Sequence, residues 1–287
     1  MTADHATVIG ASGYIGSHLV TRLRSRGLRL CCPTKGEEGR LAGVDLGDVY
    51  YCAGLTVDYA QDPVATAEAH LGLISRLLQP GRFKRVVYLS STRLYDSLAG
   101  QRVEETTALR LEPLQPRHLY DLTKAAGESL CLALAGERTR ILRLPCIWSQ
   151  GAGAPGFLPD LLRRIAGGPT QANDPPIVTK AKPNQARHYL HLEDLLDAME
   201  ASVGKGIEPI VHLASDEKAT SNAELFTFLK QRFGVNVTFG KEDETQPVLL
   251  PPLLDLGRYR ELLGQQPRPF LTRLDSLLTT LPPTLGR

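Results

Sequence analysis

The 287-residue sequence has little net charge, no long hydrophobic run and no cysteine pattern, and each of these absences excludes a class of protein. With 33 Lys and Arg against 31 Asp and Glu, the formal net charge is +2, and no basic block stands out. The composition therefore does not indicate a nucleic-acid or membrane-surface partner. No stretch approaches the roughly 18 apolar residues that a membrane-spanning helix needs. We expect a soluble globular protein of one large domain or two modest ones.

The cysteines show neither a disulfide framework nor a metal site. None is in CxxC spacing, and no His/Cys cluster has the spacing of metal ligands, so we expect buried, reduced thiols and no bound metal. The first residues, MTADHATVIG, lack the charged start, apolar core and cleavage site of a signal peptide. We therefore expect a cytoplasmic protein. The five cysteines are Cys31, Cys32, Cys52, Cys131 and Cys146.

The first half of the chain alternates short apolar runs with stretches of helical period. Asp62 is the expected cap of the second helix, and Pro63 is its first-turn residue. Buried parallel strands that alternate with helices predict an α/β fold with a doubly wound, Rossmann-type parallel sheet. Strands are expected at 5–10, 28–32, 48–54, 85–91 and 139–145, and helices at 16–26, 62–79 and 118–134.

The pattern changes after Trp148. A glycine-rich loop, SQGAGAPG, is followed by a short helical stretch, an irregular Pro- and Gly-rich segment and several short elements. These elements supply too few strands for an independent sheet. We therefore predict a dinucleotide-binding core over residues 1–148, to which some later segments return. Residues 149–287 mainly form a smaller, C-terminal substrate-binding lobe.

Residues 10–16, GASGYIG, place three glycines three apart between the first expected strand and the first expected helix. At such a junction glycines let a pyrophosphate approach the helix N-terminus, where the dipole and free N–H groups favour an anion. The spacing is GxxGxxG rather than GxGxxG. The alternative is a glycine-rich turn that only packs the helix on the sheet.

Tyr120 and Lys124, in YDLTK, are four residues apart on an expected helix and share one face. A lysine ammonium close to a phenol lowers the phenol's pKa, so the tyrosine can exchange protons with a substrate hydroxyl near neutral pH. The alternative is a solvated Tyr/Lys pair. A third motif, YLSSTRLYD at 88–96, puts hydroxyls at the carboxyl end of a strand, where parallel sheets bind ligands. Its alternative is a strand end that caps the next turn.

In order and separation, these three motifs resemble the extended short-chain dehydrogenase/reductases, specifically the NAD-dependent epimerase/dehydratase group that acts on nucleotide sugars. The resemblance covers nearly the whole chain. YCAG at 51–54 is similar to the family's turn beside the nicotinamide ribose. Three later segments are similar to further family motifs: RLPCIWSQG at 143–151, RHYLHLEDLLDAM at 187–199 and DLGRYRELLGQQP at 255–267.

The resemblance implies a role for each matching position. Tyr120 is the expected acid/base, Lys124 tunes it and binds the nicotinamide ribose, and Ser91 holds the reacting hydroxyl. Arg187 is expected to meet a substrate diphosphate, because a guanidinium suits phosphate, and its alternative is a surface ion pair. Ser91, Thr92 and Arg187 are the expected substrate contacts. The expected cofactor residues are Gly10, Ser12, Gly13, Tyr14, Ile15, Gly16, Thr34, Lys35, Ala53, Gly54, Tyr120 and Lys124.

Four departures from the family pattern are visible. Thr34 and Lys35 stand where NAD-preferring members place an acid, which favours NADP over NAD. The segment between residues 32 and 48 is too short for the usual extra helix and strand. Ala69 replaces a buried Asn that braces the active site, and His188 replaces the usual Asp or Asn of the R-D-Y motif.

The resemblance implies an NAD(P)-dependent enzyme that acts on a nucleotide-activated sugar as an epimerase or ketoreductase. A 4,6-dehydratase is disfavoured, because its acid pair after the catalytic Ser or Thr is here Thr92 and Arg93. The alternatives are a catalytically silent nucleotide-binding regulator and a reductase of a non-sugar carbonyl compound. Apolar residues on more than one face of the helices at 62–79 and 118–134 predict a homodimer.

Overall fold

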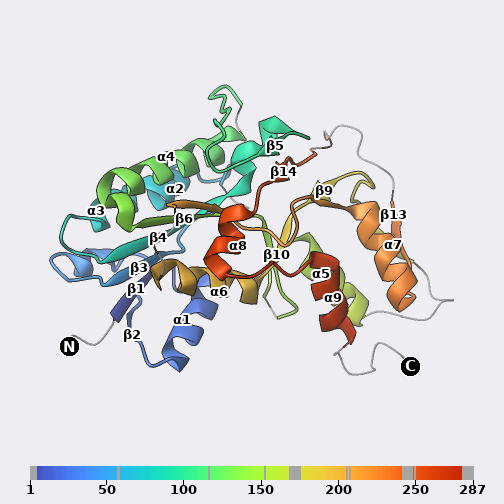
Figure 1. The fold of residues 1–287 in the computed structure, drawn as a ribbon, viewed down its shortest axis with the longest axis horizontal. Coiled ribbons are helices and arrows are strands. Elements are labelled where there is room, and N and C mark those ends of the chain that lie inside the picture. The colour runs from blue at the N-terminus through green and yellow to red at the C-terminus, as the bar shows by residue number, and fades with distance from the viewer. Residues whose placement is uncertain are drawn as a thin grey trace.

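A six-stranded parallel sheet forms the centre of the computed structural model, in the order β11-β6-β4-β3-β1-β2 (Figure 1). The structure describes residues 5–279 apart from 57–58, 116, 152, 168–175, 205, 207, 241–247 and 249. The strands are β1 (His5–Ile9), β2 (Arg29–Cys31), β3 (Asp48–Tyr51), β4 (Arg85–Ser91), β6 (Thr139–Leu144) and β11 (Ile210–His212).

The strand order reverses between β1 and β3. From β1 the chain adds β2 on one side, whereas β3, β4, β6 and β11 follow on the other. Ligands of doubly wound sheets bind at this switch point, outside the carboxyl ends of the strands. The predicted fold class is therefore confirmed. β2 is a short edge strand, and only a 3-10 helix, η1 (Glu38–Leu41), lies between it and β3.

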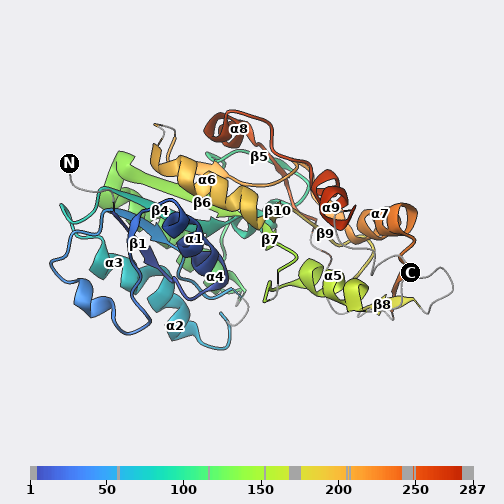
Figure 2. The same cartoon turned by 90° about the horizontal axis from the view of Figure 1, so that it is seen from below.

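Helices cover both faces of the sheet (Figures 1 and 2). One face packs against α1 (Tyr14–Ser25) and α6 (Leu192–Gly204), which bury residues such as Leu19 and Leu195. The opposite face packs against α3 (Leu73–Leu77) and α4 (His118–Ala135). The first hydrophobic core lies between the sheet and the helices α1 and α6. A further helix, α8 (Gly257–Leu263), packs on the outer side of α6 and extends this core.

The predicted helix over 62–79 is interrupted. Asp62 caps it as expected, because its Oδ1 accepts the Ala65 N–H at 2.8 Å, and Pro63 occupies the first turn. A π-helical turn, η2 (Glu68–Gly72), then separates α2 (Pro63–Ala67) from α3. Such turns occur frequently at functional sites. The helical period of the sequence predicts the segment but gives no sign of the extra residue in the turn.

A third core lies beside the sheet, towards the right of Figure 1, where α5 (Phe157–Gly167), α7 (Asn222–Phe233) and α9 (Phe270–Thr279) pack together. Part of the segment predicted as irregular, 168–175, lies outside the described residues. Paired short strands join these parts: β7 (Cys146–Trp148) with β10 (Tyr189–His191), β8 (Ile177–Thr179) with β13 (Val237–Phe239), β9 (Ala186–Arg187) with β12 (Thr220–Ser221), and β5 (Arg102–Val103) with β14 (Leu253–Leu254). Two 3-10 helices, η3 (Thr92–Leu98) and η4 (Gly136–Arg138), complete the elements.

The remaining composition-based expectations have mixed outcomes. All five cysteines are free, and Cys131 is buried, but Cys146 is exposed, so the prediction of five buried thiols is wrong. Within the described ranges, no group of His, Cys, Asp and Glu side chains has the arrangement of a metal site. No helix among the described residues combines the length and apolar character needed to span a membrane.

Candidate active site

A cleft of about 640 Å³ opens at the carboxyl ends of β1, β3 and β4, between the sheet and the third core. Most of the predicted site residues line it. Those from the sheet side are Gly13, Tyr14, Ile15, Ala53, Gly54, Ser91, Thr92, Tyr120 and Lys124, and Arg187 lies on the opposite wall. Gly10, Ser12, Gly16, Thr34 and Lys35 are not among the lining residues.

The three glycines of residues 10–16 have different reasons to be glycine. Gly10 has φ +80°, and a Cβ there would lie 2.7 Å from the backbone nitrogen of Ala53. A Cβ on Gly16 would collide with the carbonyl of Gly10, so both positions let helix and strands approach closely. Gly13 alone lines the cleft. Gly10 and Gly16 therefore fit the packing interpretation, whereas the pyrophosphate interpretation stays a prediction, for which Gly13 is the glycine at the cleft.

The N-terminus of α1 fits the pyrophosphate of a dinucleotide. Gly13 is the N-cap residue, no side chain caps the helix, and its first turn carries no acid. The first-turn N–H groups and the helix dipole are then free to meet an anion at the cleft. Across the cleft, the hydroxyl of Tyr14 lies 2.7 Å from Ser149 Oγ and so links the glycine motif to the loop after β7.

Ser91 and Tyr120 meet on the cleft wall, where both are about 5% exposed or less. Ser91 ends β4, its Oγ accepts the N–H of Arg93 at 3.2 Å, and it also bonds the Tyr120 hydroxyl. Burial raises the pKa of Tyr120, while the Ser91 hydrogen bond and the charge of Arg93 oppose that rise. Arg93 is thus the cation whose charge opposes the rise in this structure, and the expectation that Lys124 lowers the pKa of Tyr120 stays a prediction.

Lys124 faces the strands rather than the phenol. Its Nζ donates to the carbonyl of Leu89 at 2.8 Å and lies 5.0 Å from the ring centre of Tyr88. Burial lowers the pKa of Lys124 to about 8, while the carboxylate of Glu128 opposes this. Glu128 is itself held by Arg143, whose Nη2 donates to it at 2.6 Å. The ammonium is thus fixed at the carboxyl ends of β3 and β4, where it lines the cleft.

Arg93 is the functional candidate that sequence reasoning missed. Its guanidinium carbon lies 4.6 Å from the ring centre of Tyr120 and 5.3 Å from that of Tyr59, and it lines the cleft. Its Nε lies 4.0 Å from carboxylate oxygens of both Asp96 and Asp121. The sequence analysis considered Arg93 only because it stands where a 4,6-dehydratase has an acid. Its place two residues after Ser91 was the available signal.

Asp96 is the only acid lining the cleft in the part of the chain that the structure describes. Arg117 donates to its carboxylate at 2.7 Å. Burial raises the pKa of Asp96, and Arg117 opposes this. Asp121, next to Tyr120 in sequence, is buried and 3.8 Å from the same Arg117. The charges around Tyr120 therefore form a cluster of two guanidinium and two carboxylate groups.

Arg187 makes no ion pair with any described acid, so the surface ion pair is not what the structure shows. Its Nη1 donates to Asn222 Oδ1 at 3.2 Å, and its guanidinium carbon lies 4.9 Å from the ring centre of Phe157. Asn222 in turn donates to the carbonyl of Lys182 at 2.7 Å. The guanidinium is therefore oriented by an amide and a ring, and it keeps its charge available on the cleft wall.

Two departures from the family motifs have structural explanations. His188 is buried between the carbonyl oxygens of Pro252, 2.8 Å from Nε2, and Asp216, 3.2 Å from Nδ1. It therefore ties two loops together. Ala69, in η2, offers its carbonyl to the Tyr51 hydroxyl at 2.6 Å, which fixes the π-helical turn to the end of β3.

A carboxylate lies close to Thr34, at the start of η1, although Thr34 itself stands at the position of the usual acid. Thr34 Oγ1 donates to Glu37 Oε2 at 2.5 Å, and Arg40 donates to the other oxygen at 2.6 Å. The hydrogen bonds from Thr34 hold the pKa of Glu37 below its usual range, so it is ionised. Both of its oxygens are already engaged. The preference for NADP itself stays a prediction.

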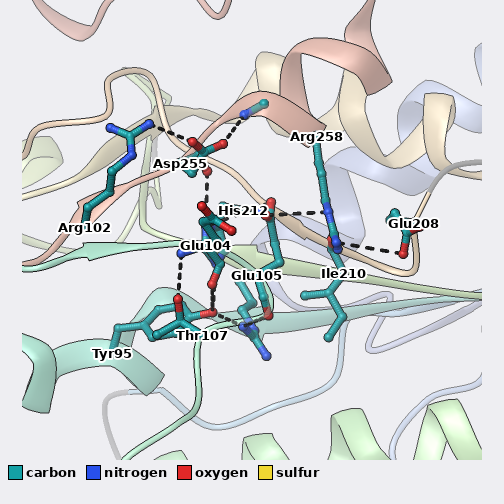
Figure 3. A network of polar contacts seen from close by, with 12 residues as sticks. Tyr95, Arg102, Glu104, Glu105, Thr107, Glu208, Ile210, His212, Asp255 and Arg258 are labelled. Carbon is teal, nitrogen blue, oxygen red and sulfur yellow. Dashed lines mark hydrogen bonds and ion pairs between the residues drawn. The ribbon is translucent and has the colours of Figure 1, made fainter.

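A polar network behind the cleft fixes the segment that follows Ser91 (Figure 3). Tyr95, on η3, donates its hydroxyl proton to the carbonyl of Glu104, and its hydroxyl oxygen lies 2.9 Å from His212 Nε2. The backbone N–H of His212 donates to the Glu105 carboxylate at 2.9 Å, and the Arg258 guanidinium lies 3.7 Å from the same carboxylate. The 3-10 helix that carries Arg93 and Asp96 is thereby anchored to β11 at the sheet edge.

The comparisons with known proteins identify the family. The model of the NAD dependent epimerase/dehydratase family matches residues 6–212. The chain belongs to this family. A dTDP-4-dehydrorhamnose reductase of Streptomyces griseus is 29% identical over 231 residues, which are 75% of this chain and 72% of the relative. A UDP-glucuronic acid decarboxylase of Arabidopsis thaliana is 24% identical over 91% of this chain, which spans 64% of that relative.

Solved structures share the fold. MoeE5 in complex with UDP-glucose and NAD has a TM-score of 0.71 at 22% identity, over 95% of this chain and 96% of that chain. A GalE-like L-threonine dehydrogenase from Cupriavidus necator, in its holo form, has a TM-score of 0.74 at 18% identity, over 96% and 98%. At these identities the likeness concerns the fold, which one protein combines with bound UDP-glucose and the other with the name of a threonine dehydrogenase.

Proposed function

We propose that this protein is an NAD(P)-dependent enzyme that exchanges hydride with a carbinol carbon of a nucleotide-activated sugar, as an epimerase or a ketoreductase. The observation that carries the proposal is the single cleft. On one continuous surface it combines an uncapped helix N-terminus, the Ser91–Tyr120 hydrogen bond and two cations. These are Lys124 and Arg187, which forms no ion pair with any described acid. The solved relative with UDP-glucose and NAD supports the choice of ligands.

In this proposal each side chain has a task that its contacts support. Tyr120 passes a proton to or from the substrate hydroxyl, and Ser91, bonded to the same phenol, holds that hydroxyl in place. Lys124 binds the cofactor ribose from the floor of the cleft. A nicotinamide ring, when bound, supplies or accepts the hydride. Arg187 on the far wall pairs with the substrate diphosphate.

Elimination of water is not part of the proposal. A 4,6-dehydratase needs an acid for the leaving hydroxyl and a base for the proton alpha to the ketone. Thr92 donates its hydroxyl to the carbonyl of Leu144 at 3.2 Å, and Arg93 stays charged, so neither serves. Asp96 lines the cleft, but it is one carboxylate where two groups are required, and Arg117 already holds it.

The cofactor proposal is NAD(P), with NADP favoured by the occupied state of Glu37. A carboxylate that binds the adenosine ribose needs free oxygens for the diol. In this structure Thr34 and Arg40 occupy them, and Lys35 adds an exposed ammonium next to them. These contacts reduce the advantage that an acid gives to NAD, although the charge of Glu37 still repels a 2′-phosphate.

We also propose that the protein forms a homodimer in the cytoplasm. The structure leaves fewer apolar residues for the interface than the sequence analysis used. Ile74, Leu77 and Leu78, which contributed to the predicted interface, are buried in the protein's own second core. Leu71 and Leu130, on α3's preceding turn and on α4, are half-buried. A dimer through these helices would therefore rest on half-buried residues rather than on a fully exposed apolar face.

The test is incubation of the purified protein with NAD or NADP and a panel of nucleotide hexoses, followed by mass spectrometry. Epimerisation without net cofactor turnover would identify an epimerase, and stoichiometric NADPH consumption by a keto-sugar would identify a ketoreductase. The matched control is Tyr120→Phe, which keeps the ring and removes the proton. A 4-keto-6-deoxy product, one water lighter, would contradict the exclusion of elimination.

One observation favours a second candidate, a dehydrogenase or reductase of a small hydroxy or keto acid. Arg93 lies on the ring of Tyr120, next to the position of the reacting hydroxyl, and a guanidinium there suits a substrate carboxylate. The structural relative that is an L-threonine dehydrogenase makes this class worth including in the same panel. Turnover of such an acid, with no turnover of any nucleotide sugar, would select it.

A further inference from the structure

His70 lies behind the cleft wall, in the π-helical turn η2, and no proposed task yet uses it. It is fully buried, and its ring centre lies 5.4 Å from that of Tyr120, edge to face. Its Nδ1 is 2.8 Å from the hydroxyl oxygen of Thr123, whereas its Nε2 is buried with no hydrogen-bond partner in the described residues. A buried polar atom without a partner is costly and calls for an explanation.

The contacts of Thr123 fix which ring nitrogen carries the proton. The Thr123 hydroxyl has a single proton, and it points to the helix carbonyls of Leu119 at 2.8 Å and Tyr120 at 3.0 Å. With its proton on one of these carbonyls, the oxygen accepts from His70, and we infer that Nδ1 is the protonated nitrogen. Nε2 is then a bare lone pair, which acts as an acceptor.

That nitrogen borders the same small space beside Gly54 as the Lys124 ammonium. Nε2 of His70 and Nζ of Lys124 lie 3.1 and 3.2 Å from one point, the position that a Cβ on Gly54 would occupy. Gly54 thus leaves room for both groups at the end of β3. The Lys124 ammonium has three N–H donors. One donates to the carbonyl of Leu89, and the others remain available towards Gly54 and His70.

We propose that His70 is a positioning residue of the active site, whose bare Nε2 accepts a hydrogen bond from the Lys124 ammonium or from a water that the ammonium holds. His70 stands one residue after Ala69 and thereby supplies a buried acceptor in the turn where the family's brace is missing. The role of Lys124 in cofactor binding rests on the proposed function, whereas the proposed tautomer and the proposed hydrogen bond between Nε2 and Lys124 do not.

The charges around the pair agree with this arrangement. Burial, with a further contribution from Lys124, lowers the pKa of His70 to about 3, so the ring stays neutral and keeps its lone pair in the working range. An acceptor that faces an ammonium favours the charged form of Lys124 and raises its pKa. The other titratable groups near the ammonium are Cys52, Tyr88, Cys131 and Glu128, the last held by Arg143.

Two substitutions separate the two nitrogens. In His70→Asn the short amide reaches only the place of Nδ1, so it can keep the bond to Thr123 but loses the acceptor near Lys124. In His70→Gln the longer amide places its oxygen where Nε2 lies. If the lysine-facing acceptor is what matters, His70→Gln resembles the wild type. If His70 only holds Thr123 in place, His70→Asn resembles the wild type instead.

The ligand-free test is ¹⁵N NMR of histidine-labelled protein, with His70→Gln used to assign the signal. We expect an Nδ1–H tautomer that persists between pH 5 and 9 and an Nε2 signal that moves in Lys124→Met. An Nε2–H tautomer, a titration near pH 6, or no response to Lys124→Met would overturn the proposal. None of these readouts depends on a substrate or a cofactor.

The second test is fluorescence titration with NADH as a function of pH. Binding is expected to fall as Lys124 loses its proton, and in His70→Asn this fall should occur about one pH unit lower, a tenfold change in proton affinity. His70→Gln should stay close to the wild type. The reverse order of the two variants would overturn the proposal. If the wild type binds neither NADH nor NADPH, the proposed function fails, and the NMR test still decides the role of His70.

Discussion

Replacement of Arg93 by methionine should raise the pKa of Tyr120, because it removes a cation that favours the ionised phenol. Burial already raises that pKa, and Arg93 opposes the rise from a position 4.6 Å from the ring centre. Two unit charges 4 Å apart interact by about 4 kcal/mol at an effective dielectric constant of about 20. Asp96 and Asp121, each 4.0 Å from the guanidinium, reduce its effect on the phenolate. We expect about 1.4 kcal/mol to remain, which is about a tenfold change.

The sign follows from the direction of the reaction. When the substrate is oxidised, the phenolate is the active form, so kcat/KM rises with pH through the pKa of Tyr120. Arg93 stabilises the phenolate. Its loss therefore moves the rising limb to higher pH, and the variant is about tenfold slower below the limb. Above the limb the two rates should converge, because the phenol is then ionised in both proteins.

The assay is the pH profile of kcat/KM for whichever substrate the panel identifies, measured in the oxidative direction. Arg93→Lys is the matched control: it keeps the charge but loses the planar fork, so its limb should lie nearer to the wild type. Unchanged melting temperatures would show that the substitutions act on the site rather than on the fold. A limb at the wild-type pH in Arg93→Met would refute the reasoning, and Lys124 would again be the cation that tunes the phenol.

Three further predictions concern catalysis, cofactor choice and assembly. Tyr120→Phe should cut turnover by at least about a hundredfold while NADH affinity stays unchanged, and Lys124→Met should do comparable damage and also weaken NADH binding. Near-normal turnover in the first variant would exclude its acid/base role. Calorimetry should show NADPH binding at least as tightly as NADH, and Glu37→Gln should shift the balance about tenfold, or 1.4 kcal/mol, further towards NADPH. A tenfold wild-type preference for NADH would contradict the Thr34 argument. Light scattering at micromolar concentration should give a dimer, and a 31.4 kDa monomer would exclude it.

The elements that position the site could be predicted because their signals are local. Period and turn residues predicted β1, β4 and α4, and these carry the glycine motif, Ser91 and the Tyr120–Lys124 pair. Spacing on one helix also predicted correctly that both side chains reach the same cleft. The cap of the second helix is equally local, since Asp62 and Pro63 act within one turn.

The electrostatics of the site could not be predicted in the same way, because they depend on contacts between distant segments. The YDLTK motif shows that Tyr120 and Lys124 share a face, but not that Leu89, 35 residues earlier, takes the ammonium. Likewise, no local signal shows that His70 meets Thr123 across 53 residues. The Glu37 carboxylate could have been found, since it is three residues from Thr34, and only its hydrogen bonds reveal that it is occupied.

We infer that Arg93 and Lys124 share two roles that the sequence analysis gave to Lys124 alone: tuning the pKa of Tyr120 and binding the cofactor. Lys124 must lie deep to reach Leu89, and at that depth burial lowers its pKa to about 8, so the ammonium needs acceptors to stay charged. The carbonyl of Leu89 accepts one hydrogen bond from it, and the proposed second acceptor is His70 Nε2, which borders the same space beside Gly54. A lysine committed to them acts less on the phenol, and Arg93, whose charge is insensitive to pH, takes over there. If this division is real, the effects of His70→Asn and Arg93→Met should be separable. The first should change cofactor binding with pH, the second should change only the proton-transfer limb, and the double variant should show both effects without a large additional loss.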